Sequence, residues 1–462
     1  MISPEDLRGA AILSAAFLSL IAAAELWRRF GNPDAEWTRK LVHLGGGMAC
    51  LFFPFLVRSP WVVLALALPL TGLFVAGSKL GFLKSLHGVK RRSRGAEYYP
   101  VAVFLVFVLT QGRPWLYLSA VLVLAVADAF AALIGSQYGR IRYEVEDETK
   151  SLEGSLVFLV LAFLAIHLPT LLLTDLPRPV CVLAALLVAA LVTGFEAISL
   201  EGADNLFVPL AVVLILAKIT SKPLSEVVFQ NLSLLAICLG VALVVWRSRT
   251  LNVGGAITFV LFTYGAWSLG NWRWALPAFL GFALYVALWF RFAPPGHASG
   301  IKVRIIVRAL LPPFAMLALA NGLGRGGTFY GPYLAATAAV LAFSLDTGVF
   351  RLERLRGRDW IFGALGLGAL AAIATSLVPW LLQSRRDPLS LLAVVGATMA
   401  ASLGNAALEL RDPELPRSRD WTAWRFLLSF AAAGAILGLQ ALGAVQAWDP
   451  SRAVHLLGGG PR

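Results

Sequence analysis

Long apolar stretches alternate with short polar loops along the whole chain. Many of these stretches run for about 17 to 25 residues, the length that an α-helix needs to cross the hydrocarbon layer of a bilayer. Inside lipid such a stretch must be helical, because no water is present to hydrogen-bond the backbone. The pattern therefore predicts an all-α, polytopic transmembrane helical bundle with about fourteen to sixteen spans.

The polar residues are distributed differently on the two sides of the "WRSRT" loop, which covers Trp246 to Thr250. Before this loop, acidic residues stand at the ends of apolar stretches. After it, the apolar stretches are nearly free of acids and are interrupted by "APPG" (293–296) and "LPP" (311–313), which usually mark helix ends or kinks. We predict two transmembrane domains, residues 1–246 and residues 247–462.

Composition and charge support a membrane protein and argue against other classes. Hydrophobic residues make up 58% of the chain and charged residues 14%, and the net charge is +13. Most basic residues lie in loops that alternation places on one side, which the positive-inside rule makes cytoplasmic. We therefore expect a multi-pass protein of an inner membrane of the bacterial type, surrounded by membrane lipid, with no nucleic-acid partner. The three cysteines lie in separate apolar stretches without C-x-x-C spacing, which argues against a disulfide framework or a thiolate metal site.

Four polar stretches fall on the predicted cytoplasmic side, where together they could form one site. They are "RKLVHLGGG" (39–47), "KLGFLKSLHGVKRRSRGAEYYP" (79–100), the stretch from Asp128 to Glu153, and "FEAISLEGADNLFVP" (195–209).

Asp128 is the most unusual residue of these stretches, because it lies inside an apolar run. A carboxylate at that depth costs roughly 2.5 to 3.5 kcal/mol on insertion scales unless it is paired or hydrated, so a functional role is favoured. The alternative is a structural hydrogen bond or ion pair between helices. Glu196 could likewise be an acid at the membrane interface, and His43, one helical turn after Arg39, could be a packing histidine.

The residue types suit a nucleoside triphosphate. Such a ligand needs carboxylates for a divalent metal, cations for the phosphates, and small residues that let backbone amides approach. The candidates are Asp128, Glu153, Glu196 and Asp204 as metal ligands, Lys150 with Arg39 or Lys40 as cations, and Gly135, Gly139 and Gly154 for close approach. There is no Walker sequence and no HExxH, and the G-x-x-x-G at Gly135 also suits helix packing.

The order and spacing of "RKLVHLGGG", "GAEYYP", "ADAFAALIGSQYG" with "KSLEGS", and "FEAISLEGADNLFVP" resemble the integral-membrane polyprenol kinases, the dolichol kinase and phytol kinase family, which is related to the phosphatidate cytidylyltransferases. The resemblance covers about Arg39 to Ile219. It implies transfer of the terminal phosphate of CTP to the hydroxyl of an isoprenoid alcohol at the cytoplasmic leaflet. One departure is Ala96, which moves Glu97 one place later than the usual Gly-Glu pair.

The resemblance also suggests roles for individual residues. Asp128 and the Lys150–Gly154 stretch match the nucleotide-binding region, while Glu196, Asp204 and Asn205 match a second acidic motif. We expect Mg²⁺ to be held by Asp128 and by Glu153 or Asp204, the charge on the leaving nucleotide to be stabilised by Lys150, and the alcohol proton to be accepted by His43 or Glu196. The expected nucleotide-binding residues are Arg39, Lys40, Gly135, Gly139, Ser151, Gly154 and Asn205.

The second half is similar to a membrane family that includes the phytyl-phosphate kinases. "SLDTG" keeps Asp346 and Thr347 but lacks a following Glu, and "ASLGNAALE" has no aspartate before its Gly. We expect this half to be an altered or catalytically silent copy.

Two other functions remain open at this point. A CTP-dependent lipid cytidylyltransferase of the phosphatidate type would use the same motifs but would release pyrophosphate instead of CDP. A cation- or proton-coupled transporter would place its acids near the bilayer midplane between repeat-related halves. Here the acids gather on one side and the halves look dissimilar, which favours an enzyme.

Overall fold

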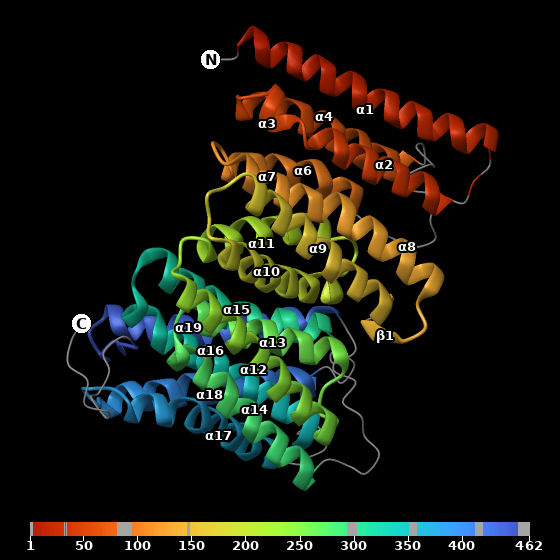
Figure 1. The fold of residues 1–462 in the computed structure, drawn as a ribbon. Helices are drawn as coiled ribbons and strands as arrows, with labels where there is room; N and C mark the ends of the chain where they lie inside the picture. Colours follow the sequence, from red (N-terminus) through yellow and green to blue (C-terminus); the bar gives the residue numbers. More distant parts are fainter. Residues whose placement is uncertain are drawn as a thin grey trace. The chain divides into compact units, whose positions relative to one another are not determined.

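The computed structural model describes residues 3–31, 33, 35–80, 95–145, 148–292, 303–350, 358–411 and 419–450. Helices form nearly all of this part of the chain (Figure 1). Within the described residues, eleven helices are long and apolar enough to cross a membrane. Four shorter apolar helices lie within Lys40–Leu56, Gly95–Leu109, Val253–Leu269 and Val307–Leu323. The predicted all-α polytopic class is confirmed. The predicted range of fourteen to sixteen spans is reached only if shorter helices are counted.

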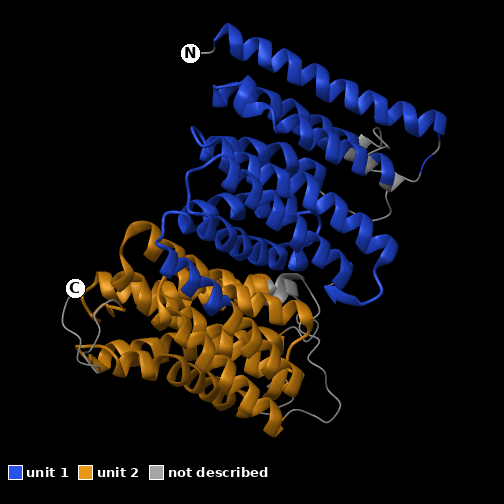
Figure 2. Cartoon of the chain, in the orientation of Figure 1, with its two compact units in different colours: residues 1–234 blue, residues 235–462 orange. Residues whose placement is uncertain are grey.

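The chain divides into two compact units, Met1–Leu234 and Leu235–Arg462 (Figure 2). The division lies within the continuous helix α12 (Leu224–Ser248), whereas the sequence suggested a boundary at the loop after it.

The first unit contains the predicted site and is built around α9. Its elements before α12 are α1 (Pro4–Gly31), α2 (Ala35–Cys50), α3 (Phe53–Leu56), α4 (Pro60–Leu80), α6 (Gly95–Leu109), α7 (Pro114–Leu122), η1 (Val123–Ala127), α8 (Asp128–Tyr138), β1 (Arg142–Val145), β2 (Glu148–Ser151), α9 (Leu152–Leu172), α10 (Arg178–Ile198) and α11 (Asp204–Ile219). Helix α9 packs against α7, α8 and α10, while α11 packs against α6, α7 and α10.

A π-helical turn, η1, joins α7 to α8 within one apolar segment, Pro114–Tyr138. The backbone N–H of Asp128 donates to the carbonyl of Val123, five residues earlier, instead of to the usual partner four residues earlier. Such turns bulge the helix and are frequent at functional sites. This one lies immediately before Asp128.

The polar segment after α8 forms a β-hairpin, which the sequence reasoning treated only as a loop. Strands β1 and β2 are antiparallel, and Tyr143 lies opposite Lys150. Strand β2 leads directly into α9, whose N-cap is Ser151: its Oγ accepts a hydrogen bond from the N–H of Gly154. The hairpin and the cap together place Lys150 at the start of α9.

The second unit is built around α16. Its elements after α12 are α13 (Val253–Leu269), α14 (Trp272–Phe292), α15 (Val303–Leu323), α16 (Gly326–Leu345), η2 (Asp346–Phe350), α17 (Asp359–Leu381), α18 (Pro388–Arg411) and α19 (Arg419–Ala441). Helix α16 contacts α14, α15, α17, α18 and α19. The prolines of "LPP", Pro312 and Pro313, lie inside α15 and do not end it. The "APPG" segment lies outside the described residues.

Candidate functional site

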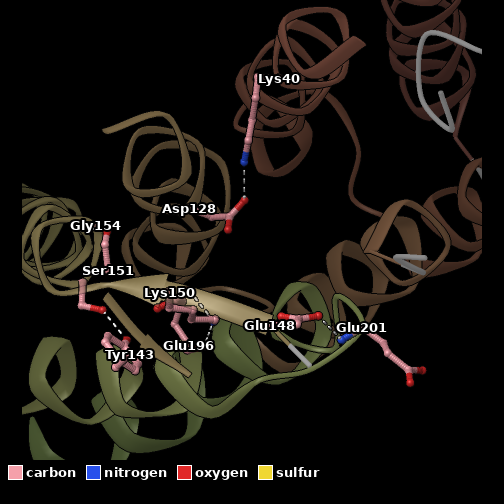
Figure 3. A network of polar contacts seen from close by, with 10 residues as sticks. Lys40, Asp128, Tyr143, Glu148, Lys150, Ser151, Gly154, Glu196 and Glu201 are labelled. Carbon is pink, nitrogen blue, oxygen red and sulfur yellow. Dashed lines mark hydrogen bonds and ion pairs between the residues drawn. The ribbon is translucent and has the colours of Figure 1, made fainter. Parts of the chain in front are cut away.

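Asp128 lies against two basic side chains from α2. Its Oδ2 is 3.4 Å from Nζ of Lys40 and 3.2 Å from Nε2 of His43 (Figure 3 shows the Lys40 contact). Lys40 is 5% exposed, so water screens this pair only weakly. The carboxylate inside the apolar segment is therefore compensated by charge.

His43 is held in a defined orientation. Its Nε2 also lies 2.9 Å from the carbonyl oxygen of Leu124, in the π-helical turn. A carbonyl oxygen only accepts hydrogen bonds, so Nε2 must carry a hydrogen in this contact. The ring of Tyr99 meets the imidazole edge-on, with centroids 5.0 Å apart. His43 is thus fixed by α6, α8 and η1.

A second charged pair lies at the hairpin. Nζ of Lys150 is 2.7 Å from Oε1 of Glu196, at the end of α10, and also donates to the backbone carbonyl of Glu196 (Figure 3). Burial disfavours the charged lysine, but the carboxylates of Glu196 and Asp204 outweigh burial and raise the pKa of Lys150. Lys150 therefore stays protonated although it is largely buried.

Asp204 connects the two charged pairs. It is the first residue of α11, after a turn in which Glu201 and Gly202 have positive φ. Burial and the nearby charges of Asp128 and Glu196 raise the pKa of Asp204 to about 6, and the charge of Lys150 only partly opposes this. Residues from α2, α8, β2, α10 and α11 thus form one electrostatically connected cluster, which draws on three of the four polar stretches of the sequence.

Glu153 has a different environment from the one predicted. One of its carboxylate oxygens accepts hydrogen bonds from the backbone N–H groups of Arg140 (3.0 Å) and Ile141 (3.1 Å). These contacts tie the start of α9 to the chain that leads into β1. Among the described residues, no three Asp, Glu, His or Cys side chains are close enough together to hold a metal ion. Of the predicted magnesium ligands, Glu153 is engaged by these backbone amides, whereas Asp128 lies near enough to Asp204 to raise its pKa. Magnesium binding by these residues stays a prediction.

The three predicted glycines approach one another and Ser151. A Cβ on Gly139 would lie 2.3 Å from the carbonyl oxygen of Gly135 and 2.6 Å from Cβ of Ser151, and a Cβ on Gly154 would lie 3.1 Å from Cα of Gly135. Oγ of Ser151 donates to the carbonyl of Gly135 at 3.4 Å. These residues let α8 and α9 pack closely, which was the alternative interpretation of the G-x-x-x-G spacing. Their contact with a nucleotide stays a prediction.

The remaining predicted residues are placed only in part. Asn205 is buried beside Asp204 in α11. The side chain of Arg39 and the basic loop 81–94 lie outside the described residues.

Sequence reasoning missed several polar contacts around the hairpin. The hydroxyls of Tyr143 and Ser155 are 2.7 Å apart, and Oε1 of Glu148 accepts a hydrogen bond from the N–H of Glu201 at 3.3 Å (Figure 3 marks both residues of this second contact). The available signal was the alternation in "RYEVEDETKS", in which the acidic pair 146–147 separates two short strand-like runs.

The second unit has a buried polar network of its own. Asn405 donates through Nδ2 to Oδ2 of Asp346 (3.2 Å) and to Oε1 of Glu409 (2.9 Å). Arg425 donates to the side chains of Asn405 (2.8 Å), Glu409 (2.8 Å) and Thr347 (2.6 Å). The acids in this network are thus bound to side chains of the same unit. Whether this unit is catalytically silent stays a prediction.

Comparison with known proteins finds a relative of known name. Over 206 residues the chain is 34% identical to the protein named phytol kinase from Synechocystis sp.. The match covers 44% of this chain and 88% of the relative. No family model matches the chain. No solved structure matches it.

Proposed function

The chain belongs to the phytol kinase family, and from this premise we propose that it transfers the terminal phosphate of CTP to the hydroxyl of an isoprenoid alcohol such as phytol or a polyprenol. The match covers less than half of the chain. The motifs of the family resemblance lie between Arg39 and Ile219, so the proposal concerns the activity of the first unit. We further propose that the protein lies in an inner membrane of the bacterial type with this site on the cytoplasmic side, because the basic loops predict that orientation.

The observation that carries the proposal is the connected cluster of Lys40, Asp128, Lys150, Glu196 and Asp204. Phosphoryl transfer demands little covalent chemistry from a protein. It depends on positioning and on neutralising the charge of the triphosphate. A partly buried cluster with two lysines and three carboxylates provides both cations for phosphate oxygens and acids for a divalent metal.

Within this proposal, Lys150 binds a phosphate oxygen and stabilises the charge that develops on the leaving CDP. Lys150 would then exchange its contact with Glu196 for the nucleotide. His43 is the better placed of the two predicted proton acceptors, because Glu196 is engaged with Lys150. Since Nε2 of His43 carries a hydrogen in its contact with Leu124, the nitrogen that would accept the alcohol proton is Nδ1.

The residues fit a magnesium ion only together with the nucleotide. Mg²⁺ is usually held by one or two carboxylates, phosphate oxygens and water. The charges of Asp128 and Glu196 both act on Asp204, but Glu196 is engaged with Lys150, so Asp128 and Asp204 are the acids that would hold the ion. When bound, Mg²⁺ would neutralise part of the charge of the phosphates.

The test is direct phosphoryl transfer by the purified full-length protein. CTP labelled at its terminal phosphate is incubated with phytol, farnesol, geranylgeraniol or undecaprenol, and labelled lipid and free nucleotide are separated. We expect a labelled lipid monophosphate and CDP. Pyrophosphate release would indicate a cytidylyltransferase, and absence of transfer from any nucleoside triphosphate to any of the alcohols would refute the kinase.

A further inference from the structure

Two side chains of β2 bind the connection between α10 and α11. Successive residues of a strand point to opposite faces, so Glu148 and Lys150 lie on one face of β2, and Thr149 lies on the other, exposed face. Nζ of Lys150 is 2.7 Å from Oε1 of Glu196, at the end of α10. Oε1 of Glu148 accepts a hydrogen bond from the backbone N–H of Glu201 at 3.3 Å. Strand β2 therefore holds this connection at two points (Figure 3).

The turn that Glu148 holds has a backbone conformation that requires support. Glu201 has a φ of 57° and Gly202 has a φ of 82°. Glycine adopts positive φ readily, but a residue with a side chain does so rarely. Such a residue keeps this conformation only where its surroundings fix it, and residues of this kind cluster at functional sites. The hydrogen bond to Glu148 supplies a fixed point at the strained residue itself.

The conformation of this turn determines where Asp204 lies. Asp204 is the first residue of α11, directly after the turn. The N–H of Asn205 donates to the carbonyl of Gly202 at 3.3 Å, so the hydrogen bonds that start α11 begin at the turn. A turn that relaxed to negative φ would move the start of α11, and with it one of the two acids that would hold the magnesium ion.

We propose that Glu148 is a positioning residue of the candidate site: its carboxylate fixes the turn at Glu201 and thereby holds Asp204 in the charged cluster. This inference rests on the proposed function, in which Lys150 exchanges its contact with Glu196 for the nucleotide. One of the two contacts of β2 with the connection is then released when the triphosphate binds, while the contact of Glu148 persists. Glu148 acts through the turn and does not touch the nucleotide.

The structural part of the test is hydrogen–deuterium exchange of the purified full-length protein without nucleotide. The wild type is compared with E148A, E148Q and E144A, where Glu144 is an exposed acid of β1 in the same hairpin and serves as the matched control. We expect the amides of residues 199–204 to exchange about 3- to 10-fold faster in E148A, the range for one hydrogen bond. E148Q keeps an acceptor oxygen, so it should exchange at nearly the wild-type rate, as should E144A.

Turnover shows whether the turn acts on the metal-binding acid. E148A should raise the Mg²⁺ concentration for half-maximal activity by about 3- to 10-fold and leave KM for the isoprenoid alcohol unchanged. The double variant E148A/E201G should recover part of this loss, because glycine adopts the positive φ of this position more readily than glutamate does. A carboxylate that itself bound the metal or the phosphates could not be replaced by a glycine in the turn.

Each outcome decides the inference. Unchanged exchange of residues 199–204 in E148A would overturn it. So would an E148Q protein impaired as strongly as E148A, or a double variant that recovers nothing. Failure of the kinase proposal is separate: a wild type that transfers no phosphate, together with faster exchange of the turn in E148A, would refute the reaction and retain the role of Glu148 in fixing the turn.

Discussion

Nζ of Lys150 lies 2.7 Å from Oε1 of Glu196 and also donates to the backbone carbonyl of that residue. Lys150→Met should lower kcat/KM for the nucleotide by about 100-fold, because the phosphates lose a charge-assisted hydrogen bond. It should also lower the melting temperature, because the largely buried Glu196 carboxylate loses its ion pair with lysine. Steady-state kinetics and thermal unfolding measure the two effects.

The double variant Lys150→Met/Glu196→Gln separates stability from catalysis. It should recover most of the melting temperature, since no unpaired carboxylate remains, but none of the activity. Recovered activity would show that Lys150 has only a structural role.

Asp128 is the acid most strongly expected to have a functional role, because it lies within an apolar, membrane-spanning segment. Asp128→Asn preserves the shape of the side chain but removes the charge that faces Lys40 and His43. We expect at least about a 100-fold loss of kcat, with normal expression and membrane insertion. Asp175→Asn, at an exposed acid in the loop between α9 and α10, is the control and should leave kcat unchanged. Full activity in Asp128→Asn would reject a metal-binding or orienting role.

Ionisation of the Asp204 carboxyl should make the nucleotide-free protein less stable as pH rises. Burial and the charges of Asp128 and Glu196 raise its pKa to about 6, above its value of 3.8 as a free side chain. A carboxyl whose pKa is raised on folding favours the folded state when protonated, so its ionisation costs stability as pH rises from about 4 through 6. Asp204→Asn cannot ionise and should therefore melt at a higher temperature than the wild type at pH 7.5.

The comparison at lower pH provides the control for this prediction. At pH 4.5 the wild-type carboxyl is mostly protonated, so the stability difference between the two proteins should shrink. A constant difference across this range, measured by thermal unfolding, would contradict the raised pKa. The variant should be catalytically impaired at both pH values, as expected where a site is built for function at the expense of stability.

The sequence predicted which charged residues gather on one side of the membrane, but it did not predict the local backbone structure that positions them. Apolar run lengths and loop charges placed Asp128, Lys150, Glu196 and Asp204 on one side, and the structure connects them. The π-helical turn was not predictable, because a shift from four- to five-residue hydrogen bonding leaves no mark in hydrophobic periodicity. Glu153 was assigned to metal because its backbone partners, Arg140 and Ile141, are determined by a hairpin that was not recognised.

The glycines between α8 and α9 should be essential for packing. Gly139→Ala would place a methyl group 2.6 Å from Cβ of Ser151, the N-cap of α9, so the end of α8 and the start of α9 must separate, at a cost of about 1 to 3 kcal/mol. Gly72→Ala in α4 meets no atom within 4 Å and is the matched control, with stability unchanged or slightly increased. Equal melting temperatures for the two variants would contradict the close packing.

Arg425 should be required for the stability of the second unit whether or not that unit is catalytic. The residue is 5% exposed and donates hydrogen bonds to Asn405, Glu409 and Thr347. Arg425→Gln removes the cation that forms the buried ion pair with Glu409, so the free energy of unfolding should fall by roughly 3 to 5 kcal/mol. Arg385→Gln changes an exposed arginine of the same unit and should have little effect. Thermal unfolding of the two variants measures this contrast, and an Arg425→Gln protein as stable as Arg385→Gln would show that the acids of the network are held neutral without the arginine.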